Sequence, residues 1–480
     1  MNYGQFLQMI PEATLVAILI IVFFADFALH RSESKGKTLY GITAVLLLLQ
    51  LVPCALADPT EAFGGLYVTS QLANVMKTIL TAGSLIVVIM AQPWVEANAK
   101  KVEGEFYMLL LSTLLGMYIM ISSGNFLMFF LGLETASVPM ACLVALDRMK
   151  KKSAEAAAKY ILTATFSSGV MLYGISFVYG AVGSLYFNDI AIRVNAGPEN
   201  WTLAVMGMVF FFSGLGFKLS LVPFHFWTAD TYEGAPTPVT GYLSVISKGA
   251  AALALCIILT KVLGGMIVYW ELMLGIVIVL TITVGNLFAI RQSELKRFMA
   301  FSSISQAGYI MLAVLGNSAM GSAALTYYVL VYVVANMAVF TVINVVEHNN
   351  GGRTDMSAYN GFYETNPRLA FLMTLALFSL AGIPPFAGMF SKFFVFMAAA
   401  EPGSFLVYFV VFVALINTVV SLYYYLLIVK AMFIKKTTTP LPTFQSDFNT
   451  KLALALCTAG VAAFGLFSCI YEWIANAATM

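Results

Sequence analysis

The stretch LAVMGMVFFFSGLGFKLSLVPFHFW, residues 203–227, is apolar over the length of a membrane-spanning helix, yet it contains Lys218 and Pro223. A bilayer core of about 30 Å is crossed by roughly 20 helical residues. Pro223 removes the backbone hydrogen bond to the carbonyl of Leu219, the residue after the lysine. The stretch therefore predicts a transmembrane helix that is broken beside a buried cation.

The composition extends this interpretation to the whole chain. Of the 480 residues, 60% are hydrophobic and 10% are charged, whereas soluble domains have about 45–50% and about 25%. This excludes a water-soluble domain of this size. A net charge of +2 with scattered Lys and Arg excludes a nucleic-acid binder. The five cysteines are far apart in apolar runs, so we expect no disulfide framework.

Fourteen apolar stretches have the length of a span, and helices are expected because open strands leave backbone groups unpaired in lipid. They are residues 12–29, 38–57, 74–96, 105–122, 125–146, 155–181, 203–227, 237–262, 270–290, 298–315, 322–346, 368–398, 405–433 and 452–475. Loops on one side of these spans hold 18 of the 25 Lys and Arg, and loops on the other side hold two, Arg193 and Lys261. This bias predicts a multi-pass membrane protein with both termini on the outer side.

Four ionisable side chains on four different spans fall near the membrane midplane: Glu134, Lys218, Lys248 and Lys392. Each lies about 14–15 Å from an end of its span, and half of the bilayer core is about 15 Å. Each would cost roughly 2.5–3.5 kcal/mol if it faced lipid, so all four are expected to face the interior. One glutamate cannot neutralise three lysines, and desolvation disfavours the charged form of an unpaired amine. The row therefore predicts a proton relay, with purely structural contacts between helices as the alternative.

Two further residues are candidate supporting groups. Lys159 lies about 9 Å from the inner end of its span, where it can also reach the membrane surface or pair with Glu155, four residues earlier. His225 lies near the inner end of its span, either as a proton inlet or as a hydrogen-bonded core residue. Lys77 and Asp26 lie close enough to span ends to meet water.

A second interrupted span reads FSLAGIPPFAGMFSKFF, residues 378–394. Pro384 and Pro385 free the carbonyls of Leu380 and Ala381. Broken helices that carry ionisable residues in corresponding halves of a chain are typical of the ion path of a transporter. The alternative is an ordinary proline kink.

The two breaks are five spans apart, which predicts a repeat. KYILTATFSSGVMLYG (159–174) and KRFMAFSSISQAGYIM (296–311) share a basic start, a serine pair and a later glycine. An odd number of helices per repeat inverts the second copy. The expected division is a three-helix addition (1–104), a first five-helix repeat (105–262), an inverted second repeat (263–433) and a C-terminal helix (434–480).

The segment FKLSLVPFHFWTADTYEGAPTPVTGYLSVISKGAA (217–251) resembles the antiporter-like membrane subunits of proton-pumping NADH:quinone oxidoreductase, respiratory complex I. The runs GLETASVPM (132–140), AEAAAKYILTATFSSG (154–169), SELKRFMAFSSISQAGYIMLA (293–313) and LAGIPPFAGMFSKF (380–393) agree with it. Of the three subunits L, M and N, the N type has Lys in both span eight and span twelve, as Lys248 and Lys392 are here.

The resemblance implies an all-α membrane protein and a role for each buried charge. Glu134 would tune Lys218, Lys248 would be the central relay, and Lys392 would serve the opposite half-channel. The chain would be the proton-translocating part of a translocase. NAD(H), flavin, iron–sulfur clusters and quinone would belong to other membrane and peripheral subunits, with no cofactor or metal site expected in this chain. The alternatives are a subunit of a secondary cation/proton antiporter and a non-transporting scaffold.

Overall fold

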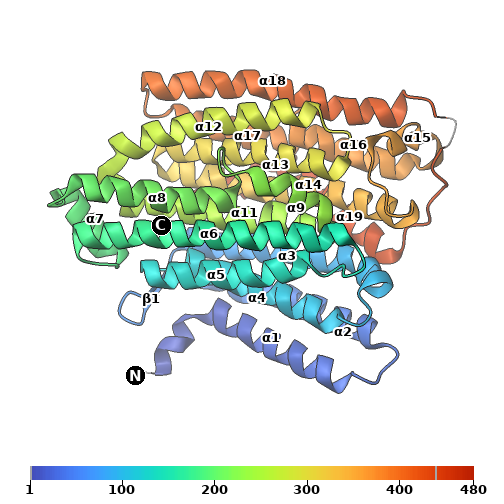
Figure 1. The fold of residues 1–480 in the computed structure, drawn as a ribbon, viewed down its shortest axis with the longest axis horizontal. Helices are drawn as coiled ribbons and strands as arrows, with labels where there is room; N and C mark the ends of the chain where they lie inside the picture. The colour runs from blue at the N-terminus through green and yellow to red at the C-terminus, as the bar shows by residue number, and fades with distance from the viewer. Residues whose placement is uncertain (1–2, 438–439, 480) are drawn as a thin grey trace.

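The computed structural model describes residues 3–437 and 440–479 and consists mainly of long helices. The helices lie side by side, from α1 at one edge of the bundle to α18 at the other (Figure 1). Within the described residues, thirteen helical segments are long and apolar enough to cross a membrane. α16 (Pro367–Ala381) and α17 (Ala387–Ala400) together supply one more span. All fourteen predicted spans are therefore present.

Twelve spans are built around one long helix each. These helices are α1 (Ile10–Ala28), α2 (Lys35–Leu56), α3 (Gln71–Asn98), α4 (Glu103–Ile121), α5 (Phe126–Val144), α6 (Lys151–Val182), α8 (Trp201–Leu219), α12 (Ile267–Ile290), α13 (Leu295–Leu312), α14 (Ala319–Asn349), α18 (Phe405–Phe433) and α19 (Phe448–Leu466). The span at 237–262 consists of α10 (Thr237–Tyr242), the π-helical turn η2 (Leu243–Ser247), α11 (Lys248–Ile257) and the π-helical turn η3 (Ile258–Val262).

Shorter elements lie between the spans, before the first span and after the last. They are the 3₁₀ turns η1 (Tyr3–Gln8), η4 (Gly264–Met266), η5 (Ala313–Gly316) and η6 (Met356–Tyr359), the strands β1 (Thr60–Ala62) and β2 (Tyr67–Thr69), and the helices α7 (Phe187–Ala196), α9 (Phe226–Gly234), α15 (Phe362–Thr365) and α20 (Cys469–Thr479). The antiparallel hairpin β1–β2 was not expected in an all-helical chain. The predicted end of the last span, at residue 475, is wrong, because α19 stops at Leu466 before the extended Phe467.

Polar residues begin several spans. The first turn of a helix has backbone N–H groups without helical partners, and a side-chain oxygen at the N-cap accepts from one of them. This happens at Ser70, Asn125, Ser318, Ser404 and Asp447. The membrane helices therefore begin where the apolar pattern meets a capping residue.

The bundle has a buried centre and an apolar rim. α13 and α14 are buried along almost their whole length, whereas α1, α2 and α18 expose large apolar side chains such as Phe24 and Phe412. An exposed apolar helix face is expected where the surroundings are lipid. The midplane charges are therefore carried by helices that surround the centre.

The two ends of the bundle differ. The N-terminal turn η1, β1 and α7 lie at one end, on the left of Figure 1. Lys- and Arg-rich loops meet at the other end, where ion pairs join Lys150 to Glu347 at 3.3 Å and both Lys152 and Arg297 to Glu233 at 2.7 Å. The basic loops assigned to one side of the membrane therefore contact one another.

Candidate functional site

Both predicted helix breaks are present. α8 ends at Leu219, the next residue Ser220 has a left-handed φ of 62°, and α9 begins at Phe226, beyond Pro223. At the second break α16 ends at Ala381 and α17 begins at Ala387. The two proline-containing segments thus interrupt their spans beside Lys218 and Lys392.

Lys218 is buried on the last turn of α8, with 4% of its surface exposed. Its amine donates to the Ser137 hydroxyl on α5 at 2.9 Å and to the Tyr160 hydroxyl on α6 at 3.3 Å. Among the described residues it forms no ion pair. Lys218 therefore has neutral partners on two neighbouring helices.

Glu134 is half-buried on α5, one helical turn before Ser137. Residues three apart share a helix face, so its carboxylate lies on the face that also meets Lys218. The amine of Lys218 is turned to Ser137 and Tyr160 instead. The direct Glu134–Lys218 pair is thus not formed in the described part of the chain, and its role as a switch stays a prediction.

Lys248 lies in the centre of the bundle, directly after the π-helical turn η2. Its amine donates to the Ser303 hydroxyl on α13 at 2.7 Å and to the Ser303 carbonyl at 3.3 Å. The ring of Tyr232 lies 5.7 Å away, and the Tyr232 hydroxyl is 3.3 Å from the Ser303 hydroxyl. Lys248 is therefore enclosed by hydroxyl, carbonyl and aromatic groups.

Lys392 lies on α17, with its amine folded back onto the second break. It donates to the Ala381 carbonyl at 2.9 Å, and the Tyr309 ring lies 5.1 Å away. The neighbouring Leu380 carbonyl accepts from Gln306 at 3.3 Å. Side-chain donors therefore satisfy both carbonyls that the prolines free.

Polar groups occupy the space between the lysines. Tyr232 and Ser303 lie beside Lys248, while Gln306 bonds to Tyr328 and Tyr425 on the side of Lys392. A cavity of about 10 Å³ adjoins Lys392, which is about the room that one water molecule needs. Five buried polar groups on or next to the same elements have no hydrogen-bond partner in the described chain: Ser220, Thr228, Thr231, Ser247 and Asn336 Oδ1.

Lys159 and His225 lie in different surroundings. Lys159 is exposed and pairs with Glu155 at 2.7 Å and with Asp230 at 2.6 Å. His225 is buried immediately before α9, and its ring packs on Phe226 with centroids 4.5 Å apart. Both lie near the first break, but the Lys218 amine donates to Ser137 and Tyr160 and to neither of them.

Three features of the site escaped the sequence interpretation. The first is the π-helical turn that precedes Lys248. The second is the contact of Tyr232 and Ser303 with Lys248, although both residues lie in runs that were compared with the family, 217–251 and 293–313. The third concerns Lys77, which does not reach water but is fully buried in an ion pair with Glu12. The sequence contained a signal for this pair, because Glu12 and Lys77 have opposite charges and lie near the same end of the first and third spans.

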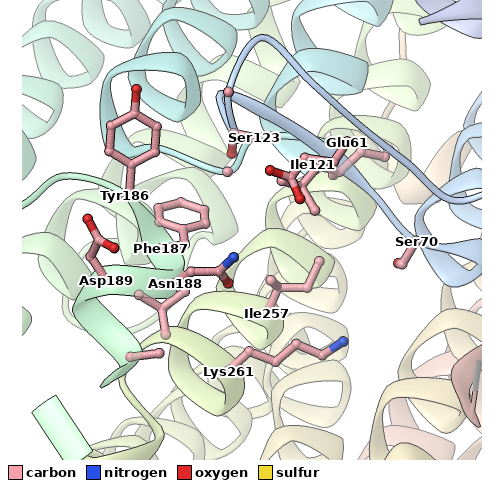
Figure 2. Close-up of a pocket in the computed structure, with 16 residues that line it drawn as sticks. Glu61, Ser70, Ile121, Ser123, Tyr186, Phe187, Asn188, Asp189, Ile257 and Lys261 are labelled. Atoms are coloured by element: carbon pink, nitrogen blue, oxygen red, sulfur yellow. The ribbon is translucent and has the colours of Figure 1, made fainter. Parts of the chain in front are cut away.

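A surface cavity of about 440 Å³ lies away from the row, between β2, α7 and the end of η3. Glu61 and Lys261 reach it from opposite walls, with Asn188 between them (Figure 2). None of the midplane lysines lines it. Within residues 3–437 and 440–479, no cluster of three metal-ligating side chains occurs.

Comparison with known proteins agrees with this architecture. The family model described as NADH:quinone oxidoreductase/Mrp antiporter, TM, matches residues 123–421. A chain of respiratory complex I from Thermus thermophilus is 30% identical, with a TM-score of 0.79 over 95% of this chain and 97% of that one. A chain of the Mrp complex from Dietzia sp. shares the fold, with a TM-score of 0.83 at 21% identity over 100% and 97%. The fold and the buried lysines thus define a multi-pass, antiporter-like membrane subunit.

A curated relative narrows the class further. The NADH-quinone oxidoreductase subunit N of Phocaeicola vulgatus is 53% identical, over the full length of both chains. The chain belongs to the NADH-quinone oxidoreductase subunit N family.

Proposed function

We propose that this chain moves protons across a bacterial inner membrane as a subunit of a redox-driven NADH:quinone oxidoreductase. Lys218, Lys248 and Lys392 would form the relay, and Glu134 would control the first of them. The observation that carries the proposal is that three enclosed lysines on three elements each have neutral partners and no carboxylate partner among the described residues.

Because these lysines have no counter-ion among the described residues, their amines can release and take up a proton. Burial disfavours the ammonium form, whereas hydroxyl and carbonyl oxygens accept from it. A neutral amine can accept a proton from one side and release it to the other. The three lysines therefore suit a relay better than a set of fixed ion pairs.

The groups between the lysines support a hydrated path. Buried polar atoms are nearly always hydrogen-bonded, and ordered water supplies the partner where protein does not. Unpartnered groups such as Thr231, Ser247 and Asn336 lie on elements that line the route. A path of hydroxyls and water is what proton transfer from Lys218 through Lys248 to Lys392 requires.

Glu134 would gate the relay by approaching Lys218. Truncating one partner of a buried pair costs about 3–5 kcal/mol, whereas moving one charge against 100 mV costs about 2.3 kcal/mol. Making or breaking that single contact is therefore large enough to hold or release a proton. His225 and Lys159 would line the inner approach, and Lys392 would serve the opposite half-channel.

The remaining parts of the proposal concern the assembly. The basic loops would lie in the cytoplasm and both termini in the periplasm. NAD(H), flavin, iron–sulfur clusters and quinone would be held by other membrane and peripheral subunits. The chain would divide at residues 104, 262 and 433 into the N-terminal addition, two inverted repeats and the C-terminal helix.

The test uses the whole complex reconstituted in vesicles. Lys218→Ala and Glu134→Ala should leave assembly and NADH oxidation by an artificial acceptor intact and should reduce proton translocation at least about tenfold, a barrier change of about 1.4 kcal/mol. Lys151→Gln, at the exposed first residue of α6, is the matched control. Unchanged translocation in both relay variants would refute the proposal.

The second candidate is a subunit of a secondary cation/proton antiporter, which the shared family model favours. The polypeptides that purify with the chain separate the two. Iron–sulfur subunits support the redox-driven complex, whereas their absence together with Na⁺-dependent proton movement supports the antiporter.

A further inference from the structure

The N-terminal unit contains a buried ion pair that lies outside the proposed relay. Lys77 Nζ on α3 is 2.7 Å from Glu12 Oε1 on α1, and the two side chains are 0% and 4% exposed. Tyr67 on β2 donates to Glu12 Oε2 at 3.0 Å, and Lys77 donates to the Tyr67 hydroxyl at 3.2 Å. The pair therefore joins two helices and the hairpin at one point.

The same polar cluster reaches α2 and α4. The Thr81 hydroxyl donates to the Lys77 carbonyl at 2.7 Å and forms a hydrogen bond with the Tyr118 hydroxyl on α4. Tyr118 also lies 3.1 Å from the Cys54 sulfur on α2. Four helices and one strand are thus linked through one buried network.

α3 forms the wall behind Lys248. A Cβ added to Gly83 would lie 2.2 Å from Ile246 Cδ1, within the π-helical turn. A Cβ added to Gly249 would lie 3.6 Å from Leu80 Cδ2. Leu80 and Gly83 follow Lys77 on α3 by three and six residues. The end of α3 that carries the ion pair is therefore continuous with the part that contacts the segment around Lys248.

α4 forms the wall behind Glu134. A Cβ added to Gly116 would lie 2.3 Å from the Ala136 nitrogen and 2.7 Å from the Gly132 carbonyl oxygen. These two residues flank Glu134 on α5, and Tyr118 follows Gly116 by two positions. A shift of α4 would therefore displace the backbone that carries Glu134.

We propose that Glu12 and Lys77 are positioning residues for the proton relay. They hold α3 and α4 in the arrangement that sets the backbone around Lys248 and Glu134. This inference rests on the proposed function. Buried ion pairs often contribute little net stability compared with apolar packing, and the best-attested use of buried polar groups is to fix one arrangement of helices. Loss of one partner leaves an uncompensated charge that drives the helices apart or admits water.

The test compares Lys77→Met with the double variant Glu12→Leu, Lys77→Met in the assembled complex. Hydrogen exchange of residues 243–249 and protons translocated per NADH are measured for each. Lys77→Met should raise the exchange rate of 243–249 about tenfold through local opening and lower the translocation ratio, and the double variant should restore both. The control Asp26→Asn removes a partly exposed pair with Lys35, 2.7 Å long at the other end of α1, and should change neither quantity.

Unchanged exchange of 243–249 in Lys77→Met overturns the proposal. A double variant with normal exchange but no translocation also overturns it, because the pair would then carry protons itself. If Lys77→Met does not assemble, Glu12→Gln takes its place against the double variant with the same expectations. Normal translocation by both the Lys218 and the Glu134 variants refutes the proposed function instead, so the two failures are distinguishable.

Discussion

Lys77 and Lys248 are equally enclosed, but their amines have opposite kinds of partner. Lys77 lies 2.7 Å from a carboxylate, whereas Lys248 lies 2.7 Å from a hydroxyl. A carboxylate stabilises the ammonium form at every pH at which both groups are charged, and a hydroxyl does not. A buried lysine without a carboxylate partner is therefore suited to proton transfer, because its ammonium form is not held by a counter-ion. A buried lysine with a carboxylate partner is suited to holding helices together.

The same substitution, Lys to Met, at the two lysines should give the largest difference in the stability of the subunit. Lys77→Met leaves Glu12 buried and unpaired and should destabilise the subunit by about 3–5 kcal/mol. Lys248→Met removes an amine that has no counter-ion among the described residues, so stability should stay within about 1.5 kcal/mol of the unmodified chain, as in volume-conserving core exchanges. Thermal release of this subunit from the detergent-purified complex measures both. Equal losses would break the comparison, because Lys248 would then have a hidden charged partner.

The Ser303 hydroxyl beside Lys248 allows a test of whether the neutral partner of a relay lysine takes part in proton transfer. Ser303→Ala removes the nearest acceptor of the Lys248 amine. A hydrogen bond to a charged group contributes about 1.5–3 kcal/mol, so proton translocation should fall about tenfold while NADH oxidation by an artificial acceptor persists. Ser153→Ala is a matched control, because that buried hydroxyl donates to the Val144 carbonyl away from the row. A Ser303 variant that pumps normally would exclude Ser303 from the path.

The fold was largely predictable because the thickness of the membrane sets the length of each apolar helix. An apolar run of about 20 residues can be read from the sequence without any partner, and the fourteen spans follow from this. A proline in a helix interior removes a backbone hydrogen bond, but it does not always end the helix, because Pro53, Pro93 and Pro139 lie within the continuous helices α2, α3 and α5. The two breaks were predicted from prolines that follow or precede a buried lysine. The end at Leu466 and the hairpin β1–β2 could not be predicted in this way, because both depend on contacts with other segments.

The site was predictable only as a set of residues at similar depth. Depth follows from position along a helix, but the direction of an amine depends on which helices lie beside it. Lys77 finds a carboxylate on α1, 65 residues earlier in the chain, and Lys218 finds Ser137 rather than Glu134. The π-helical turn before Lys248 likewise has no signal in hydropathy, although such turns are frequent at functional sites.

Lys159 is the exposed member of the comparison and should show the smallest effect. It has two carboxylate partners, Glu155 and Asp230, within 2.7 Å. Exposed pairs contribute about 0.2–1 kcal/mol, so Lys159→Gln should reduce translocation by no more than about fivefold. Because ions screen exposed charges, that reduction should shrink as salt is raised from 20 mM to roughly 500 mM. A loss of translocation as large as that of the Ser303 variant, and independent of salt, would contradict this expectation. Lys159 would then act as a relay lysine although it has two carboxylate partners. The presence of a counter-ion would no longer distinguish positioning lysines from relay lysines.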